Sequence, residues 1–198
     1  MQILNCRLKV DLSLVATLTL AALVVGSGGT GVFAQDREAS EYVIKAAFLY
    51  NFAKFTEWPP ESAGKADDPI TLCVVGEDPF GNILNQTIEG KTVRGRRLVI
   101  WRLRSGEDLK GCQIAFIGSA ERSQMQAIIE RLKGAGVLTV GDREGFAALG
   151  GVINFKMVDN KVHFDVNVDA AERARLKISS KLLSLARIVK DGEKGTKN

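Results

Sequence analysis

Short apolar runs that alternate with helical patterns constrain the fold of this chain more than any other feature of its sequence. Each run is four to six residues long and mostly apolar, which is typical of a strand buried on both faces of a sheet. The four runs are residues 70–75, 98–103, 113–117 and 137–140. Strands that alternate with helices predict an α/β fold, here a single three-layer domain with a mostly parallel sheet and helices on both faces.

The helical segments between these runs carry their own boundary signals. Asp78 is expected to cap one helix, with Pro79 at its first position and with Phe80, Ile83, Leu84 and Thr87 on its inward face. Ser119 is expected to cap a second helix, and Gly134 is expected to end it. Its inward residues follow the spacing i, i+3, i+4, i+7 at Met125, Ile128, Ile129 and Leu132.

A β-hairpin is predicted at the end of the sheet. Residues 153–158 and 161–168 read as strands, and Asp159 and Asn160 between them favour a two-residue turn. This turn pairs Phe155 with Phe164 and separates two faces. The apolar face contains Ile153, Phe155, Met157, Val162, Phe164 and Val166; the polar face contains Asn154, Lys156, His163, Asp165 and Asn167.

Two helices are expected after the hairpin. Asp169 is expected to cap the first, with Glu172 at its third position. Ser179 is expected to cap the second, which would run to about residue 189 with Leu182, Leu185, Ala186 and Val189 facing inward. Residues 191–198 read as a frayed charged tail.

The N-terminus has the three-part layout of a secretory signal peptide. Arg7 and Lys9 precede an uncharged run over residues 12–25, and Val32-Phe33-Ala34 forms a cleavage site. We therefore expect residues 1–34 to be removed and residues 35–198 to form the secreted domain. A retained N-terminal anchor is the alternative. The mature chain would have a net charge of +3, too small to indicate a nucleic-acid partner.

Two cysteines remain after the leader is excluded. Cys73 lies in the first predicted strand and Cys112 precedes the third, so parallel neighbours could bring them within bridging distance. An oxidising compartment favours one intramolecular disulfide, and two buried free thiols are the alternative. A zinc site is not expected, because two Cys and one His are too few ligands. No other metal or cofactor is expected.

The first helix, expected over residues 41–57, is apolar around most of its circumference. Ser40 would cap this helix, and Pro59-Pro60 would stop it. Because the sheet covers only one side, we expect part of the aromatic face to lie at a dimer or partner interface. Packing of the final helix over that side is the alternative. The aromatic residues are Tyr42, Phe48, Tyr50, Phe52, Phe55 and Trp58.

A glycine-rich connection follows the fourth strand, where open α/β sheets bind ligands. Candidate ligand-binding residues are Gly141, Asp142, Arg143, Phe146 and Asn154, with Phe146 as an aromatic wall. A purely structural connection is equally compatible with the pattern. The pair His163 and Asp165 could serve acid–base chemistry, but no nucleophile motif accompanies it. The basic cluster over residues 94–97 reads as a solvated loop.

Three stretches of the sequence together resemble the YfiR family of secreted periplasmic regulators. They are residues 41–60, 70–81 and 150–186, which span nearly the whole mature chain in order. The resemblance implies a periplasmic α/β protein, often a dimer. It would bind and repress the sensor region of an inner-membrane signalling enzyme, a diguanylate cyclase in the best-known case, and thereby control cyclic di-GMP.

The resemblance also bears on the cysteines. Cys73 and Cys112 fall where the family often has one disulfide, whereas a second, C-terminal pair has no counterpart in this chain. Related domains occur beside histidine kinases, so the client could also be a kinase. A small periplasmic solute-binding protein is the second reading of the sequence, and an enzyme built around His163 and Asp165 is the third.

Overall fold

The computed structural model describes residues 31–65, 67–118 and 122–192. The chain divides into two compact units, residues 1–39 and 40–198. Of the first unit the described part is the start of helix α2 (Gly31–Phe55), which continues into the second unit. The predicted leader falls mostly on residues 1–30, outside the described part, and its cleavage after Ala34 stays a prediction.

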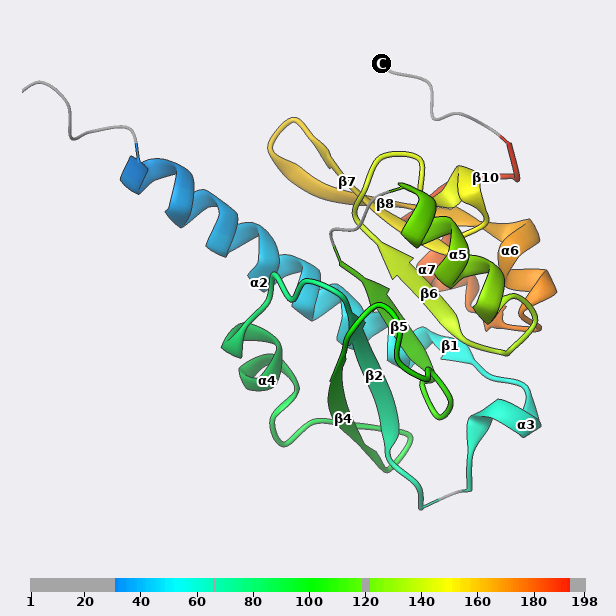
Figure 1. Ribbon diagram of the computed structural model, residues 1–198. Helices are drawn as coiled ribbons and strands as arrows, with labels where there is room; N and C mark the ends of the chain where they lie inside the picture. Colours follow the sequence, from blue (N-terminus) through cyan, green and yellow to red (C-terminus); the bar gives the residue numbers. More distant parts are fainter. Residues whose placement is uncertain (1–30, 66, 119–121, 193–198) are drawn as a thin grey trace, which may run out of the picture. The chain divides into compact units, whose positions relative to one another are not determined.

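Within the described residues of the second unit, eight strands form one sheet in the order β10-β8-β7-β6-β5-β2-β4-β3 (Figure 1). Pairing is parallel except in the β3–β4 and β7–β8 hairpins, which confirms the mostly parallel sheet. The strands are β2 (Ile70–Val75), β3 (Thr92–Val93), β4 (Arg96–Leu103), β5 (Ile114–Ile117), β6 (Leu138–Gly141), β7 (Ile153–Val158), β8 (Lys161–Asn167) and β10 (Arg187–Val189).

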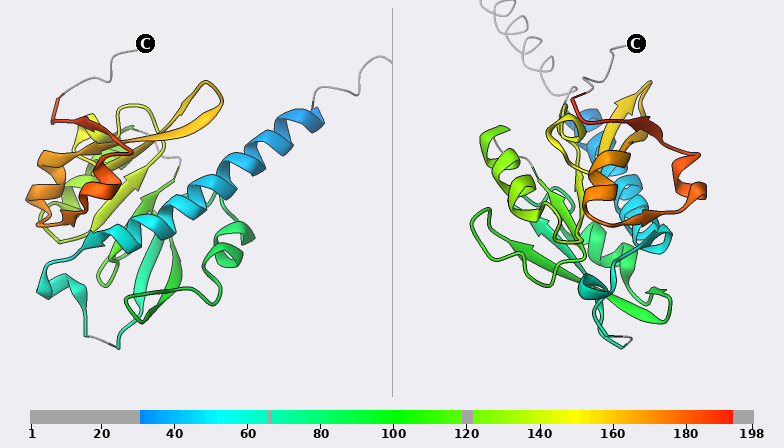
Figure 2. Two further views of the ribbon diagram at one scale, coloured as in Figure 1. Left: turned by 180° about the vertical axis from the view of Figure 1, so that it is seen from behind. Right: turned by 90° about the vertical axis from the view of Figure 1, so that its right-hand side faces the viewer.

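Helices cover both faces of this sheet, as predicted (Figures 1 and 2). One face, with Leu72 and Val74 of β2, packs against α2, α4 (Asn82–Ile88), α6 (Val168–Arg173) and α7 (Ser180–Leu183). The opposite face, with Cys73 and Val75, packs against α5 (Arg122–Leu132) and the short helix η1 (Ala147–Leu149). Successive side chains of β2 therefore belong to two separate hydrophobic cores, one on each face of the sheet.

The first helix is longer than expected at its start and shorter at its end. Ser40 lies inside α2 and does not cap it. The helix ends at Phe55 because the next residues, β1 (Thr56–Glu57), pair with β9 (Lys177–Ile178) from the far end of the chain. Directly after the expected stop at Pro59, residues 60–63 form the short helix α3 (Pro60–Ala63).

Helix α4 also begins later than predicted. The Asp78 carboxylate accepts the backbone N–H groups of Phe80 and Gly81 at 2.8 and 3.3 Å and so closes a turn. The helix starts only at Asn82, after Gly81 with φ +50°. The next helix, α5, buries the four predicted inward residues; its expected cap Ser119 lies outside the described residues.

The hairpin of β7 and β8 follows the prediction closely. Asp159 and Asn160 have φ of +49° and +58°, as a two-residue hairpin turn requires. The register pairs Phe155 with Phe164 and Ile153 with Val166. The cap of α6, by contrast, is Asn167, whose side chain accepts the Ala170 N–H at 3.0 Å, and not Asp169.

The end of the chain departs most from the prediction. Ser179 caps α7, but this helix stops at Leu183, and residues 187–189 form β10, parallel to β8. Leu185 is consequently 65% exposed instead of facing inward. Asp191, predicted at the start of a frayed tail, accepts hydrogen bonds from Arg173 and Asn167.

Candidate functional site

The glycine-rich connection after β6 is filled by the protein's own side chain. Phe146 is fully buried, and its ring lies against two glycines. A Cβ atom added at Gly141 would lie 2.6 Å from the ring, and one added at Gly151 would lie 2.1 Å from it. The interpretation of Phe146 as an aromatic wall for a ligand is therefore wrong: the glycines are needed for close packing of this ring.

Asp142, the acidic candidate in this connection, is bonded to helix α2. Its carboxylate accepts hydrogen bonds from Lys45 Nζ at 2.8 Å and from the Tyr42 hydroxyl at 3.1 Å. Lys45 is a buried cation, and it also forms an ion pair with Glu41 at 2.6 Å. Burying a charge is tolerated when it is paired in this way. The network fixes the second unit's part of α2 to the end of β6.

The remaining candidates of the connection also have structural partners. The Asn154 amide donates to the carbonyl oxygens of Gly141, Arg143 and Phe155 at 3.3, 3.1 and 2.9 Å. Thr139 Oγ1 accepts the Val152 N–H at 3.0 Å. These bonds satisfy buried polar groups within the connection. We interpret the connection as structural, which the sequence had left as one of two alternatives.

His163 and Asp165 are not assembled as an acid–base pair. The buried Asp165 carboxylate accepts two hydrogen bonds from Arg187, at 2.9 and 2.8 Å, and lies 2.7 Å from Lys156 Nζ. The His163 side chain is exposed on the same strand. Asp165 therefore stabilises the pairing of β8 with β10, and its carboxylate is engaged by Arg187 and Lys156.

The aromatic face of α2 divides into core and half-buried residues. Phe52 is fully buried, with ring centroids 5.5 Å from Phe155 and 5.1 Å from Phe164, so its assignment to an interface is wrong. The β7–β8 hairpin covers this side of α2, for which the sequence offers the final helix as the covering element. Tyr42, Phe48, Tyr50, Phe55 and Trp58 remain half-buried.

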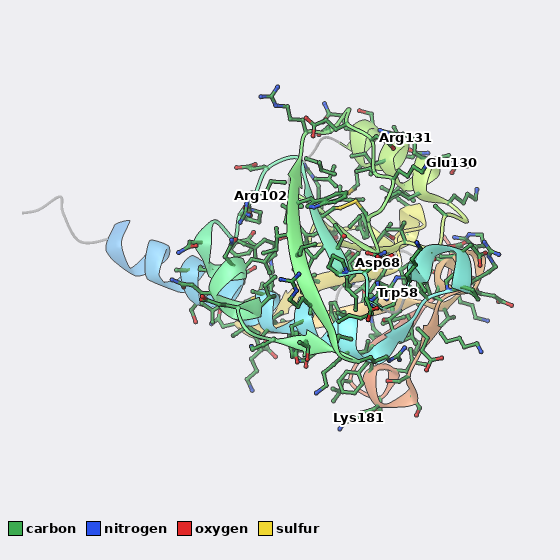
Figure 3. All side chains as sticks on the ribbon, turned by 90° about the horizontal axis from the view of Figure 1, so that it is seen from below. Trp58, Asp68, Arg102, Glu130, Arg131 and Lys181 are labelled. Atoms are coloured by element: carbon green, nitrogen blue, oxygen red, sulfur yellow. A yellow bond between two sulfur atoms is a disulfide. The ribbon has the colours of Figure 1, made fainter. Side chains whose placement is uncertain are left out.

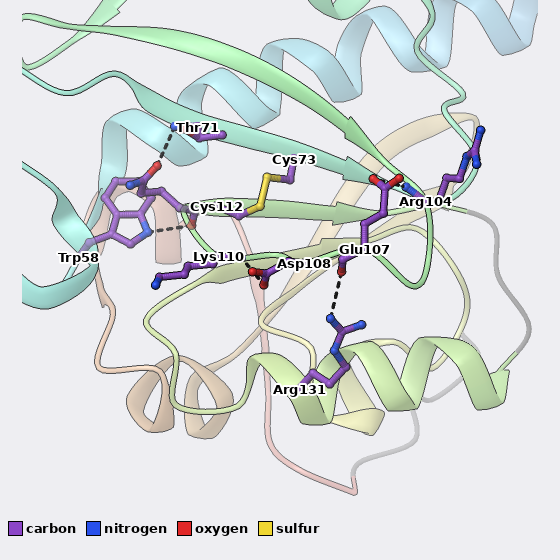
Figure 4. Close-up of a disulfide and its surroundings, with 10 residues drawn as sticks. Trp58, Thr71, Cys73, Arg104, Glu107, Asp108, Lys110, Cys112 and Arg131 are labelled. Carbon is purple, nitrogen blue, oxygen red and sulfur yellow. Dashed lines mark hydrogen bonds between the residues drawn. A yellow bond between two sulfur atoms is a disulfide. The ribbon is translucent and has the colours of Figure 1, made fainter.

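The two cysteines of the described domain are bonded to each other. Cys73 of β2 and Cys112, just before β5, have Cα atoms 5.8 Å apart (Figure 4). The parallel pairing of β2 with β5 creates this distance. Beside the disulfide, the Gln113 side chain accepts the Thr71 N–H at 2.7 Å, and Trp58 Nε1 donates to the Gln113 carbonyl at 2.9 Å.

A family model described as YfiR/HmsC-like matches residues 42–187. The chain belongs to the YfiR/HmsC-like family. The match begins in α2 and ends at Arg187, so it covers the described sheet except for the last two residues of β10. Membership supports a periplasmic regulator of cyclic di-GMP signalling in general, and a regulatory rather than a catalytic protein.

A cavity that the sequence did not indicate lies between α5, η1 and α6 of this YfiR/HmsC-like domain. It has a volume of about 460 Å³. Arg173 and Asp191 lie at its edge and form an ion pair. The hydrogen bonds from Arg173 hold the pKa of Asp191 below its ordinary value of 3.8. No local pattern marks this cavity, because its walls come from segments up to 62 residues apart, from Ile129 to Asp191.

Two further features concern the described residues alone. No helix among them is long and apolar enough to cross a membrane. In the same part of the chain, no group of three or more His, Cys, Asp or Glu side chains could hold a metal ion.

Proposed function

We propose that this protein is a secreted periplasmic regulator that binds the sensor region of an inner-membrane diguanylate cyclase and represses the enzyme. The observation that carries the proposal is the YfiR/HmsC-like match over residues 42–187. The chemistry of the domain supports it, because Asp165 is neutralised by two cations and the glycine-rich connection is filled by Phe146. The leader over residues 1–34 would deliver the protein to the periplasm.

Repression would work by differential binding. A regulator that binds one arrangement of the sensor more tightly shifts the cyclase toward that arrangement. Changing the active fraction from 99% to 1% requires about 10⁴-fold tighter binding to the inactive arrangement. Loss of the complex would release the enzyme.

The outward side of α2 is the surface that we propose for the partner or for a second copy. Val43 and Ile44 are 50% and 42% exposed, and the exposed Ala47 and half-buried Phe48 continue the same stripe. We call these four residues the α2 patch. Exposed apolar residues that gather on one surface mark interaction sites in soluble proteins. The half-buried aromatic residues Tyr42, Tyr50, Phe55 and Trp58 would border the patch.

Deletion of the gene in its host tests the proposed function. Cyclic di-GMP in the cells should rise, and it should return to the wild-type level when the full-length gene is restored. A gene that lacks codons 2–34 should not restore it, because the product would stay in the cytoplasm. Unchanged cyclic di-GMP after deletion would contradict repression of a cyclase.

A matched pair of variants tests the α2 patch. Ile44→Glu places a charge in the patch, and Ile188→Glu places the same charge at an isoleucine of similar exposure (45%) on β10. We expect only Ile44→Glu to lose repression while both proteins stay folded. Light scattering then distinguishes the occupants: a halved mass for Ile44→Glu indicates a second copy, and an unchanged mass indicates the client.

A further inference from the structure

Strand β4 is an open edge of the sheet along most of its length. Its outer neighbour β3 pairs only with Arg96 and Arg97. The Leu103 carbonyl accepts the Gly76 N–H at 2.8 Å on the β2 side. Because successive residues of a strand direct their backbone groups to opposite sides, Leu98, Ile100 and Arg102 present theirs away from β2. Leu98 adjoins the short β3–β4 ladder, but no described residue is hydrogen-bonded to the outward backbone groups of Ile100 and Arg102.

Positive charge predominates along this edge. Residues 91–104 contain six Lys and Arg and no Asp or Glu. Some of these cations have partners: Arg102, labelled in Figure 3, lies 2.6 Å from Asp78, and Arg96 donates to the Asp68 and Pro69 carbonyls. The exposed side chains of Arg97 and Arg104, by contrast, have no hydrogen-bond or ion-pair partner among the described residues.

Trp101 adds an apolar surface beside the same edge. It is 45% exposed and shares a strand face with Arg97, four residues earlier. The rim of its ring lies about 3.5 Å from the position that a Cβ atom would take at Gly111, so one side of the ring is covered by the loop before Cys112. The other part of the ring is open to a neighbouring chain.

We propose that the β4 edge binds an extended, acidic segment of a partner protein as an added strand. The outward groups of Ile100 and Arg102 would form the backbone ladder. An acidic residue opposite Val99, and so diagonal to Arg97 on the same face, and an apolar residue opposite Trp101 would give the segment its specificity, as cross-strand pairs do. The proposal concerns a different surface from the α2 patch and does not depend on the identity of a cyclase.

Charge argues against a second copy of this chain as the occupant. Antiparallel pairing of two β4 strands would bring together two copies of a segment, residues 91–104, that has six Lys and Arg and no Asp or Glu. Like charges directly opposite one another destabilise a strand pair. The exposed arginines thus oppose self-association of the edge and favour an acidic partner.

A designed peptide tests the proposal on the exported protein. The probe is a blocked peptide of about eight residues with the repeat Glu-Thr-Val-Thr, which places Glu and Val on one face, titrated by NMR. We expect saturable binding with a Kd below about 1 mM and shifted signals along β4. Arg97→Glu should weaken binding at least about tenfold, or 1.4 kcal/mol. Lys161→Glu, the same charge change at the distant hairpin, should change it less than about threefold because of salt screening.

Backbone pairing is tested separately. Ile100→Pro removes an outward N–H without removing a bond to β2, and it should abolish binding. If that variant fails to fold, the same peptide with alternate N-methylated amides tests the wild type and should not bind. Equal binding of the methylated peptide, or no binding at about 1 mM, would overturn the proposal. So would a concentration-dependent dimer that Arg97→Glu strengthens, since a second copy would then occupy the edge.

Discussion

The packing of Phe146 against Gly141 and Gly151 gives a sharp test of the structural role of this connection. A methyl group at Gly151 would lie 2.1 Å from Cε1 of a fully buried ring, far inside van der Waals contact. Gly151 has no positive φ, so the backbone itself accepts alanine and the effect is purely steric. Overpacking of this kind destabilises by about 1–3 kcal/mol, and we expect Gly151→Ala to lie near the upper value.

Removal of the ring should remove most of this steric cost. Phe146→Ala alone should lower the free energy of unfolding by about 3–5 kcal/mol, because it leaves a cavity. In the double variant, alanine at position 151 meets empty space, so the total loss should be smaller than the sum by about 1–3 kcal/mol. Gly141→Ala, with 2.6 Å to the same ring, should behave in the same way.

Guanidinium unfolding of the oxidised, exported protein measures these differences. The midpoints should shift while the slope m stays constant, since the same surface is exposed in every variant. Strict additivity of Phe146→Ala and Gly151→Ala would refute the close contact. A wild-type stability for Gly151→Ala would do the same, and it would reopen the connection as a site for a ligand.

Three further outcomes follow from named contacts. Replacing both Cys73 and Cys112 by alanine should reduce the free energy of unfolding, measured by denaturation, by about 4 kcal/mol, because the disulfide closes a separation of 39 residues. Mass spectrometry of the native protein should find no free thiol in this pair. Lys45→Ala should reduce the same free energy by about 3–5 kcal/mol, whereas Lys45→Met, which keeps the apolar stem, should reduce it less; equal losses would contradict the packing of that stem. Arg173 lowers the pKa of Asp191, so the pair stabilises the fold above pH 3.8, and this contribution is lost as the pH falls through the lowered pKa. The difference in free energy of unfolding between wild type and Asp191→Asn should therefore vanish in acid. A difference that grows in acid would contradict the ion pair.

Local patterns predicted the elements whose signals lie within a few residues of each other. The turn at Asp159-Asn160 fixes the hairpin register, and the spacing of Met125 and Ile129 fixes the buried face of α5. The apolar run of β2 predicts a strand buried on both faces, and it is one.

Long-range partners explain where sequence reasoning failed. Leu182, Leu185 and Val189 have helical spacing, yet residues 187–189 pair with β8 as a strand of the sheet. No local sequence signal indicates this pairing. Asp142 was a reasonable ligand-binding candidate by its place after a strand. Its actual partner, Lys45, is 97 residues away. The hairpin likewise covers Phe52, so this one aromatic residue of α2 belongs to the core instead of an interface.

The central claim, repression from the periplasmic side, can be measured directly on spheroplasts of a host strain that lacks the gene. The oxidised protein, residues 35–198, is added to the outside, where it reaches the sensor but not the cytoplasm. The account predicts that intracellular cyclic di-GMP falls with a saturable dependence on protein concentration, and that heat-unfolded protein has no effect. Cyclic di-GMP that stays constant at saturating folded protein would contradict the account.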